Sequence, residues 1–328
     1  MAQVGLRGDE YEAFDRPGRR SSRPRTKDRP DYADAETGMV ITIDRGRFRV
    51  LISERDVSAT KARQLGRTAV IVGDKVRVVG DTSGAEGTLA RIVEVEERQT
   101  VLRRTADDDD PYERPIVANA DQLVIVTALA DPPPRTGMID RVLVAGYDAG
   151  IQPLLCLTKA DLAPPDDLIA QYEPLGIPIE VVSPGADRDP LRARLRGHRS
   201  VFVGHSGVGK STLVNALIPG ADRAIGAVSE ATGRGRHISS SAIALRLPDS
   251  TDSWVIDTPG VRSFGLSHVS RNRIIAAFPD LRTIAEDCPR GCRHDDAAPE
   301  CALDAAVANG DLSPTRLESF RRMLGSGQ

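Results

Sequence analysis

The sequence predicts a multidomain protein: an N-terminal all-β barrel, a central α/β domain, and a C-terminal helical domain that holds a metal. Three observations predict this order. Short β-like runs at close spacing fill residues 38–104, apolar strands alternate with helix-length segments from Gln122, and three cysteines and a histidine lie within residues 288–301. Alternation of strands and helices is typical of a parallel sheet with helices on its faces.

Length and composition allow several hydrophobic cores. The chain has 328 residues, of which 40% are hydrophobic and only 4% aromatic, so we expect cores of Val, Ile, Leu and Ala. No apolar run approaches the roughly 20 residues of a membrane span. The N-terminus also lacks the apolar core of a signal peptide. We therefore expect a cytoplasmic protein without a membrane partner.

The formal net charge of -3 conceals a basic N-terminus, because residues 16–29 carry seven Arg or Lys against one acid. Residues 1–36 have almost no aliphatic content and are expected to form a disordered basic tail. A solvated tail without function and a tail that contacts nucleic acid both remain open.

Residues 37–105 are expected to form the barrel, with the OB-fold as the leading choice. The β-like runs cover residues 39–44, 47–52, 68–73, 75–80 and 88–97. Basic side chains on or beside these runs predict contact with RNA phosphates. They are Arg45, Arg47, Arg49, Arg55, Lys61, Arg63 and Arg67. Four consecutive aspartates and Pro111 then predict a solvated linker over residues 106–120.

The α/β domain is expected over residues 121–267. Its apolar strands are predicted at 122–129, 153–158, 177–182, 199–204, 242–248 and 253–257, with helices around 137–149 and 166–175. The ligand of such a domain binds at the carboxyl ends of its strands.

A phosphate-binding loop follows the strand at 199–204. Gly204–Ser211 matches G-x-x-x-x-G-K-[ST] and precedes a helix-like segment. Backbone amides of this loop, the helix N-terminus and the Lys210 ammonium converge on phosphates, and Ser211 can bind Mg²⁺. The predicted nucleotide contacts here are Gly204, His205, Ser206, Gly207, Val208, Gly209, Lys210, Ser211 and Thr212.

A guanine-reading segment is predicted at Thr158-Lys159-Ala160-Asp161, after the strand at 153–158. Asp161 would accept two N–H groups that guanine offers and adenine lacks, which selects GTP over ATP. Lys159 is expected along the base. Thr158 replaces the usual asparagine, which predicts weaker bracing of the loop. Ser183, after the next strand, is expected near the guanine oxygen.

Asp257-Thr258-Pro259-Gly260 matches D-x-x-G, in which the aspartate meets Mg²⁺ through water and the Gly260 amide reaches the γ-phosphate. Residues 231–241 between this motif and the phosphate loop are basic and rich in hydroxyls, as in a switch loop. The second Mg²⁺ hydroxyl is expected from Ser239 or Ser240, with Thr232 as a third possibility.

The C-terminal domain, residues 268–328, holds Cys288, Cys292, His294 and Cys301. Three thiolates and an imidazole are a complete tetrahedral set for one structural Zn²⁺. A redox or free-thiol role is the alternative. Cys156 lies alone in an apolar run and is expected in the core.

The motif order resembles the circularly permuted, ribosome small-subunit-dependent GTPases of the RsgA/YjeQ family. The guanine segment precedes the phosphate loop, GRGRH and DTPGVRSFGL follow, a β-barrel comes before and a Cys/His cluster after. The resemblance implies an OB-fold, a permuted GTPase domain and a zinc-binding domain. It also implies a monomer that binds rRNA and acts late in small-subunit assembly, with GTP hydrolysis stimulated by the subunit.

Val261 stands where Ras-like enzymes have the glutamine that orients the attacking water. We expect slow intrinsic hydrolysis and a polar group supplied by the switch loop, with His237 as the candidate catalytic residue. Contact of His237 with rRNA is the alternative. Two other functions remain open: an RNA-binding assembly scaffold whose nucleotide site switches but hardly turns over, and a P-loop ATPase or kinase.

Overall fold

The computed structural model describes residues 32–66, 69–104, 114–221, 242–248, 250–259, 271–276 and 278–325. Five strands close into a barrel in the order β1-β2-β3-β5-β4, with β4 returning to β1. The pairing of β3 with β5 is parallel and the others are antiparallel. This arrangement confirms the predicted all-β barrel of OB-fold type. Its strands are β1 (Glu36–Asp44), β2 (Arg47–Ile52), β3 (Arg55–Lys61), β4 (Lys75–Val79) and β5 (Ala90–Val95).

One predicted barrel strand is wrong. Within the described part of residues 68–73, only Val72 forms a strand pairing, an isolated bridge to Val117. The barrel strand between β2 and β5 is β3 instead. This segment is apolar because it joins two cores: Val70 packs in the barrel and Val72 in the α/β domain. Gly73 has φ +89°, and a Cβ there would lie 2.0 Å from the Ala118 carbonyl oxygen, so a regular strand cannot continue past it.

A buried polar junction fixes the same segment. The fully buried carboxylate of Asp74 accepts hydrogen bonds from the Ile71 amide at 2.8 Å and from Arg98 Nε and Nη2 at 2.7 and 2.9 Å. The Asn119 side chain accepts from the Gln99 amide and donates to the Gly73 carbonyl, both at 2.9 Å. Each of these polar groups therefore has a partner inside the protein.

A short hairpin follows the barrel, formed by β6 (Val101–Arg104) and β7 (Arg114–Ala118). The end of the segment predicted as a linker, residues 106–120, is therefore a paired strand. Residues 105–113 lie outside the described part of the chain.

The α/β domain contains six strands of the main sheet in the order β10-β9-β8-β11-β13-β12. All pair in parallel except β12, which is antiparallel to β13. The fold therefore matches the predicted α/β class. The strands are β8 (Gln122–Ala128), β9 (Gln152–Thr158), β10 (Ile179–Val181), β11 (Arg199–Gly204), β12 (Ile243–Arg246) and β13 (Trp254–Asp257).

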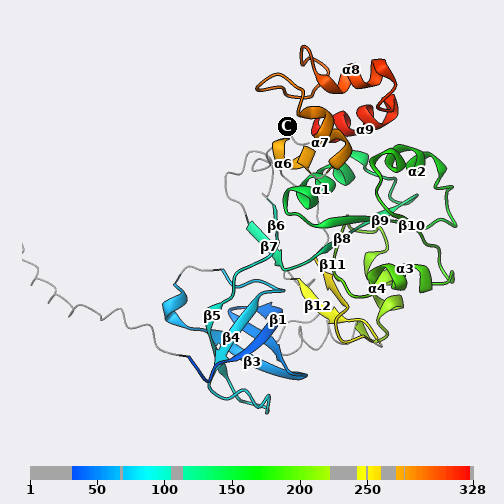
Figure 1. Ribbon diagram of the computed structural model, residues 1–328. Coiled ribbons are helices and arrows are strands. Elements are labelled where there is room, and N and C mark those ends of the chain that lie inside the picture. The colour runs from blue at the N-terminus through cyan, green and yellow to red at the C-terminus, as the bar shows by residue number, and fades with distance from the viewer. Residues whose placement is uncertain are drawn as a thin grey trace, which may run out of the picture. The chain divides into compact units, whose positions relative to one another are not determined.

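Helices cover both faces of these strands (Figure 1). Strand β8 shows why, because Leu123 and Ile125 pack in one core and Val124 and Val126 in the other. Helices α1 and α2 belong to the first core, and α3 and α4 to the second. The helices are α1 (Thr136–Asp148), α2 (Asp166–Tyr172) with the 3₁₀ turn η2 (Glu173–Leu175), α3 (Asp189–Leu195) and α4 (Lys210–Leu217).

The C-terminal part is helical, as predicted. Helix α9 buries Leu317, Phe320 and Met323 in the core that also holds Tyr172 of α2. Arg322 adds an ion pair of 3.2 Å to Asp140 of α1. Among the described helices, none is long and apolar enough to cross a bilayer. The helices are α6 (Arg271–Ala276), α7 (Pro279–Ala285), α8 (Ala302–Asn309) and α9 (Pro314–Gly325).

Strand β12 connects the barrel and the α/β domain, because it lies between β13 and β1 in a single eleven-stranded sheet. The junction with β1 is antiparallel and pairs Thr42 with Ile243. Main-chain hydrogen bonding therefore runs from the barrel into the strands of the α/β domain.

Replacing Asp74 with alanine should lower the free energy of unfolding by about 3 kcal/mol, because the Ile71 amide and the Arg98 guanidinium lose their common acceptor. Urea denaturation would measure this. Asp56→Ala is the control, since its pair with Arg49 is exposed and should contribute less than about 1 kcal/mol. Equal effects of the two substitutions would contradict the assignment.

Candidate functional site

The strands of the α/β domain bring three distant segments to one edge of the sheet. The register pairs Ala128 with Thr158, Gly204 with Val126, and Phe202 with Asp257. Because β8, β9, β11 and β13 run in parallel, the residues that follow their carboxyl ends lie at the same edge. The predicted guanine segment, phosphate loop and D-x-x-G motif all begin there.

The phosphate loop has the backbone geometry its glycines allow. A Cβ on Gly204 would lie 2.6 Å from the Val126 carbonyl oxygen, and Gly207 and Gly209 have φ of +86° and +87°. Helix α4 begins immediately afterwards at Lys210. A loop of this shape in front of a helix presents backbone amides and the positive helix end to a phosphate.

Lys210 joins the phosphate loop to the D-x-x-G motif. Its side chain is buried, and the ammonium donates to the Asp257 carboxylate and, at 2.5 Å, to the Thr258 carbonyl. The Thr258 hydroxyl donates in turn to the Phe202 carbonyl at 2.7 Å. Ser211 follows at the first turn of α4 and is exposed. A cation beside phosphate-facing amides, with a hydroxyl and a carboxylate nearby, fits a nucleotide with Mg²⁺.

Thr158 connects the guanine segment to the phosphate loop. The buried hydroxyl lies 2.6 Å from the Val208 carbonyl and 3.1 Å from the Thr127 carbonyl, and its single proton can serve one of them at a time. The Thr158 side chain thus reaches the phosphate loop, and weaker bracing than asparagine would give stays a prediction.

The remaining guanine-segment residues lie beside Thr158. Lys159 has φ +59°, and its ammonium donates to the Asp131 carbonyl. Asp161 is exposed at the start of the following loop. The loop that carries Ser183 is a neighbour, because the Ala160 amide donates to the Val182 carbonyl at 3.4 Å and Arg188 holds the Ser183 carbonyl at 2.7 Å.

Sequence reasoning missed the loop that follows β8. Pro132 approaches the phosphate loop, at 3.6 Å from the position of a Cβ on Gly207. With Thr127, Gly204 and Val208 it lines a small cavity of about 20 Å³. The sequence sign was three consecutive prolines, residues 132–134, shortly after a buried strand that ends at the ligand-binding edge of the sheet.

Several predicted residues lie outside the described part of the chain, so their positions play no part in this geometry. They are Thr232, His237, Ser239, Ser240, Gly260 and Val261.

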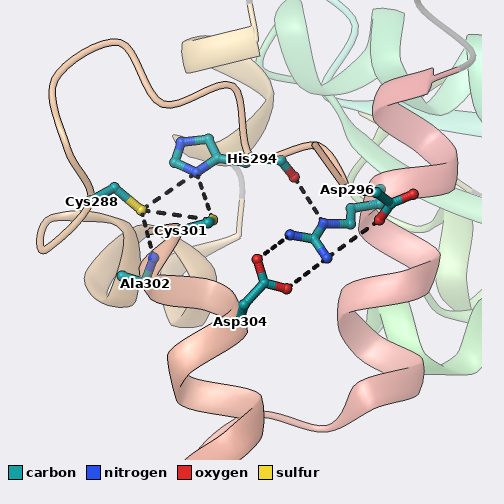
Figure 2. Close-up of polar contacts among 7 residues, drawn as sticks. Cys288, His294, Asp296, Cys301, Ala302 and Asp304 are labelled. Carbon is teal, nitrogen blue, oxygen red and sulfur yellow. Dashed lines mark hydrogen bonds and ion pairs between the residues drawn. The ribbon is translucent and has the colours of Figure 1, made fainter. Parts of the chain in front are cut away.

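The four predicted metal ligands meet in the C-terminal part of the chain, and Figure 2 shows three of them, Cys288, His294 and Cys301. Ligand atoms of Cys288, Cys292, His294 and Cys301 all lie within 4.8 Å of one another. His294 Nδ1 is 3.6 Å from Cys288 Sγ and 3.7 Å from Cys301 Sγ, and the two sulfurs are 4.0 Å apart. The edges of a tetrahedron with Zn–S bonds of about 2.3 Å measure about 3.8 Å, so the group fits a tetrahedral metal ion.

Neighbouring groups support this centre, and sequence reasoning did not find them. The Ala302 amide donates to Cys288 Sγ at 3.3 Å. Arg321 Nε donates to the His294 carbonyl at 3.0 Å, and the same guanidinium binds Asp304 at 2.8 and 2.7 Å. Those hydrogen bonds lower the pKa of the Asp304 carboxyl. Such contacts orient the ligand loop and offset ligand charge.

Comparison with known proteins bears on this arrangement. A family model described as RsgA GTPase matches residues 95–267. The chain belongs to the RsgA GTPase family. GTP hydrolysis is therefore its activity, and the family accounts for the guanine segment preceding the phosphate loop.

The similarity to curated relatives covers most of the chain. "Small ribosomal subunit biogenesis GTPase RsgA" of Pseudomonas aeruginosa (strain LESB58) is 39% identical over 305 residues, covering 90% of this chain and 87% of the relative. The protein of the same name from Azotobacter vinelandii is 43% identical over 267 residues, covering 79% and 75%.

Two solved structures share the fold of this RsgA-family chain. YjeQ from Thermotoga maritima has a TM-score of 0.64 at 24% identity and covers 89% of this chain and 98% of its own. YloQ, described as a circularly permuted GTPase, has the same TM-score and identity and covers 91% and 97%.

The predicted RNA-contacting residues of the barrel differ in the contacts that they make within the protein. Arg49 pairs with Asp56, and Arg55 pairs with Glu36. Arg45 and Arg47 are exposed at the turn between β1 and β2, while Arg67 lies outside the described residues. Arg49 and Arg55 therefore contact carboxylates of the barrel itself.

Replacing Cys301 with serine should reduce the bound metal from about one ion per chain to almost none, because a closed four-ligand site loses one thiolate. Elemental analysis of the dialysed protein measures this. Cys156→Ala is the matched control: Cys156 is the remaining cysteine, is buried in the α/β core, and should leave the metal in place. A Cys301→Ser protein with full metal content would show that the cluster is not the site.

Proposed function

We propose that this GTPase acts in the late maturation of the small ribosomal subunit and hydrolyses GTP to GDP and phosphate when the subunit stimulates it. The observation that carries the proposal is the meeting of three segments: Lys210 contacts Asp257 and Thr258, and Thr158 contacts Val208. The name of the curated relatives, a small-subunit biogenesis GTPase, supports the ribosomal part.

In the proposed site, the phosphates lie on the amides of residues 204–212. Lys210 would neutralise charge on the β- and γ-phosphates, and Ser211 and Asp257 would hold Mg²⁺. Ser239 or Ser240 supplies the second hydroxyl, and the Gly260 amide meets the γ-phosphate. The support is the shape of the loop and the buried position of Lys210 against Asp257.

The base would lie beside Asp161, whose carboxylate accepts two guanine N–H groups. Lys159 covers the base while its ammonium stays on the Asp131 carbonyl, and the loop of Ser183 meets the guanine oxygen. The Thr158 hydroxyl keeps this segment at a fixed distance from the phosphate loop, because it contacts the Val208 carbonyl. The base and the phosphates would therefore bind to two segments that are held at a fixed distance from each other.

For hydrolysis we propose that water attacks the γ-phosphorus. The His237 side chain orients this water and accepts its proton. GDP leaves with its charge compensated by Lys210 and the helix N-terminus. The Val261 side chain has no hydrogen-bonding group for this task. Binding to the small ribosomal subunit would bring His237 to the γ-phosphate, which makes turnover depend on the ribosome.

The metal would be one structural Zn²⁺, since three thiolates and an imidazole leave no open position for substrate. The barrel would contact rRNA phosphates, and the chain would work as a monomer in the cytoplasm beside its ribosomal partner.

Steady-state phosphate release with and without purified small subunits tests this function. We expect strong stimulation of the wild type and its loss in His237→Ala with GTP binding retained. Nucleotide binding without any stimulation would favour an assembly scaffold with a nucleotide switch. Full stimulated turnover of His237→Ala would exclude His237 from the mechanism while leaving the function intact.

Changing Asp161 to asparagine should weaken GTP binding about tenfold to a hundredfold, because charged hydrogen bonds to the base are lost. Xanthosine triphosphate should bind better to the variant than to the wild type, since the asparagine amide can donate to its extra carbonyl. Competition against a fluorescent GDP analogue measures both affinities. Unchanged preference for GTP would place the base elsewhere, and Asp166→Asn, on the following helix, is the control.

A further inference from the structure

The barrel is connected to the D-x-x-G motif by a single row of paired residues. Ile243 of β12 pairs with Thr42 of the barrel on one side and with Asp257 on the other. Asp257 is also opposite Phe202 of β11. One strand, β12, therefore separates the barrel from the carboxylate assigned to the Mg²⁺ side.

A side-chain contact connects the other end of β12 to the barrel. Arg246 donates to both carboxylate oxygens of Glu54, at 2.5 and 2.9 Å. Glu54 lies in the turn between β2 and β3 and has φ +70°. The guanidinium of Arg246 also lies 5.0 Å from the ring centroid of Trp254, its partner on β13. These hydrogen bonds from Arg246 lower the pKa of the Glu54 carboxyl.

The hairpin of β12 and β13 is short and closed. Each strand has four residues, and the Leu247 amide donates to the Ser253 carbonyl at 2.9 Å where the hairpin turns. Strand β12 begins at Ile243, two residues after the end of the predicted switch loop, residues 231–241, and β13 ends at Asp257. A displacement of β12 is therefore passed to Asp257, its partner on β13.

The Glu54–Arg246 contact suits a positioning role better than a stabilising one. Both side chains reach solvent, with exposed fractions of 69% and 27%, and exposed ion pairs contribute little to stability. The two hydrogen bonds to Glu54 and the Trp254 ring beside the guanidinium instead fix the orientation of the Arg246 side chain. Among the described residues, main-chain pairing between the hairpin and the barrel is limited to Thr42 and Ile243.

We infer that the barrel positions the Mg²⁺ side of the nucleotide site through β12, with Glu54 and Arg246 as the positioning residues. An RNA phosphate backbone that binds the barrel and tilts it would then shift Asp257. The inference rests on the proposed function, because it assigns a regulatory input to that same site.

The test compares Glu54→Lys with Asp56→Lys in the full chain. Both residues are acids of one hairpin, and both are paired bidentately with an arginine, but Asp56 pairs with Arg49 inside the barrel. The readout is the Mg²⁺ concentration that halves the dissociation rate of a fluorescent GDP analogue. Glu54→Lys should raise it about two- to fivefold, the range an exposed ion pair can supply. Asp56→Lys should leave it unchanged, and Glu54→Lys with Arg246→Glu should return it toward the wild-type value.

Trp254 is the only tryptophan of the chain, so its emission without nucleotide reports whether the hairpin is folded in each variant. Glu54→Gln repeats the comparison if the lysine variant is unfolded. Equal shifts for the Glu54 and Asp56 variants, no shift for either, or no recovery in the double variant would overturn the inference while the function stands. A wild type without Mg²⁺-dependent binding of the GDP analogue would overturn the proposed function and this inference together.

Discussion

The parallel pairing of β11 with β8 on one side and β13 on the other is the constraint on which the rest of the site depends. It sets Gly204 opposite Val126 and Asp257 opposite Phe202. Residues that are 78 and 55 positions apart along the chain thus meet at one edge of the sheet. Two polar contacts then close the frame, from Lys210 to Asp257 and from Thr158 to Val208. The order of the segments along the chain has no bearing on these contacts, which is why a permuted chain can keep the site.

The permutation does change what the site is attached to. Entry into the α/β domain comes from the barrel and the β6–β7 hairpin, and β12 pairs directly with β1. Exit from it leads to helices that pack back on α1 and α2, through Phe320 and the Arg322–Asp140 pair. The α/β domain is therefore attached to the barrel through β12 and to the C-terminal helices through α1 and α2. A metal ion held by the Cys288, Cys292, His294 and Cys301 group would stabilise the C-terminal helices by fixing the loop between α7 and α8, where the sequence has few apolar residues of its own.

Much of the candidate site could be predicted because its residues carry local signs. Glycines at 204, 207 and 209 are required by close approach or positive φ, and the four metal ligands fall within fourteen residues. Strands β8, β9 and β11 are buried on both faces and appear as continuous apolar runs. The family resemblance rested on these same residues.

The parts that escaped prediction depend on contacts between distant segments. Strand β3, with the sequence RDVSATK, turns only Val57 and Ala59 fully inward, while the more apolar residues 69–73 serve two cores and form no strand. The reach of the Thr158 hydroxyl to Val208 and the support of Cys288 by the Ala302 amide have no sequence pattern. Glu54 and Arg246 are 192 positions apart, so only the folded chain brings them together.

The central claim is that separated segments form one guanine-nucleotide site at this edge of the sheet. Hydrogen–deuterium exchange of the full chain, with and without GDP and Mg²⁺, tests it most directly. The account predicts slower exchange at both residues 157–162 and residues 204–212, and a smaller effect in β12 and β13. Protection confined to residues 204–212, with unchanged exchange around Thr158 and Asp161, would contradict it.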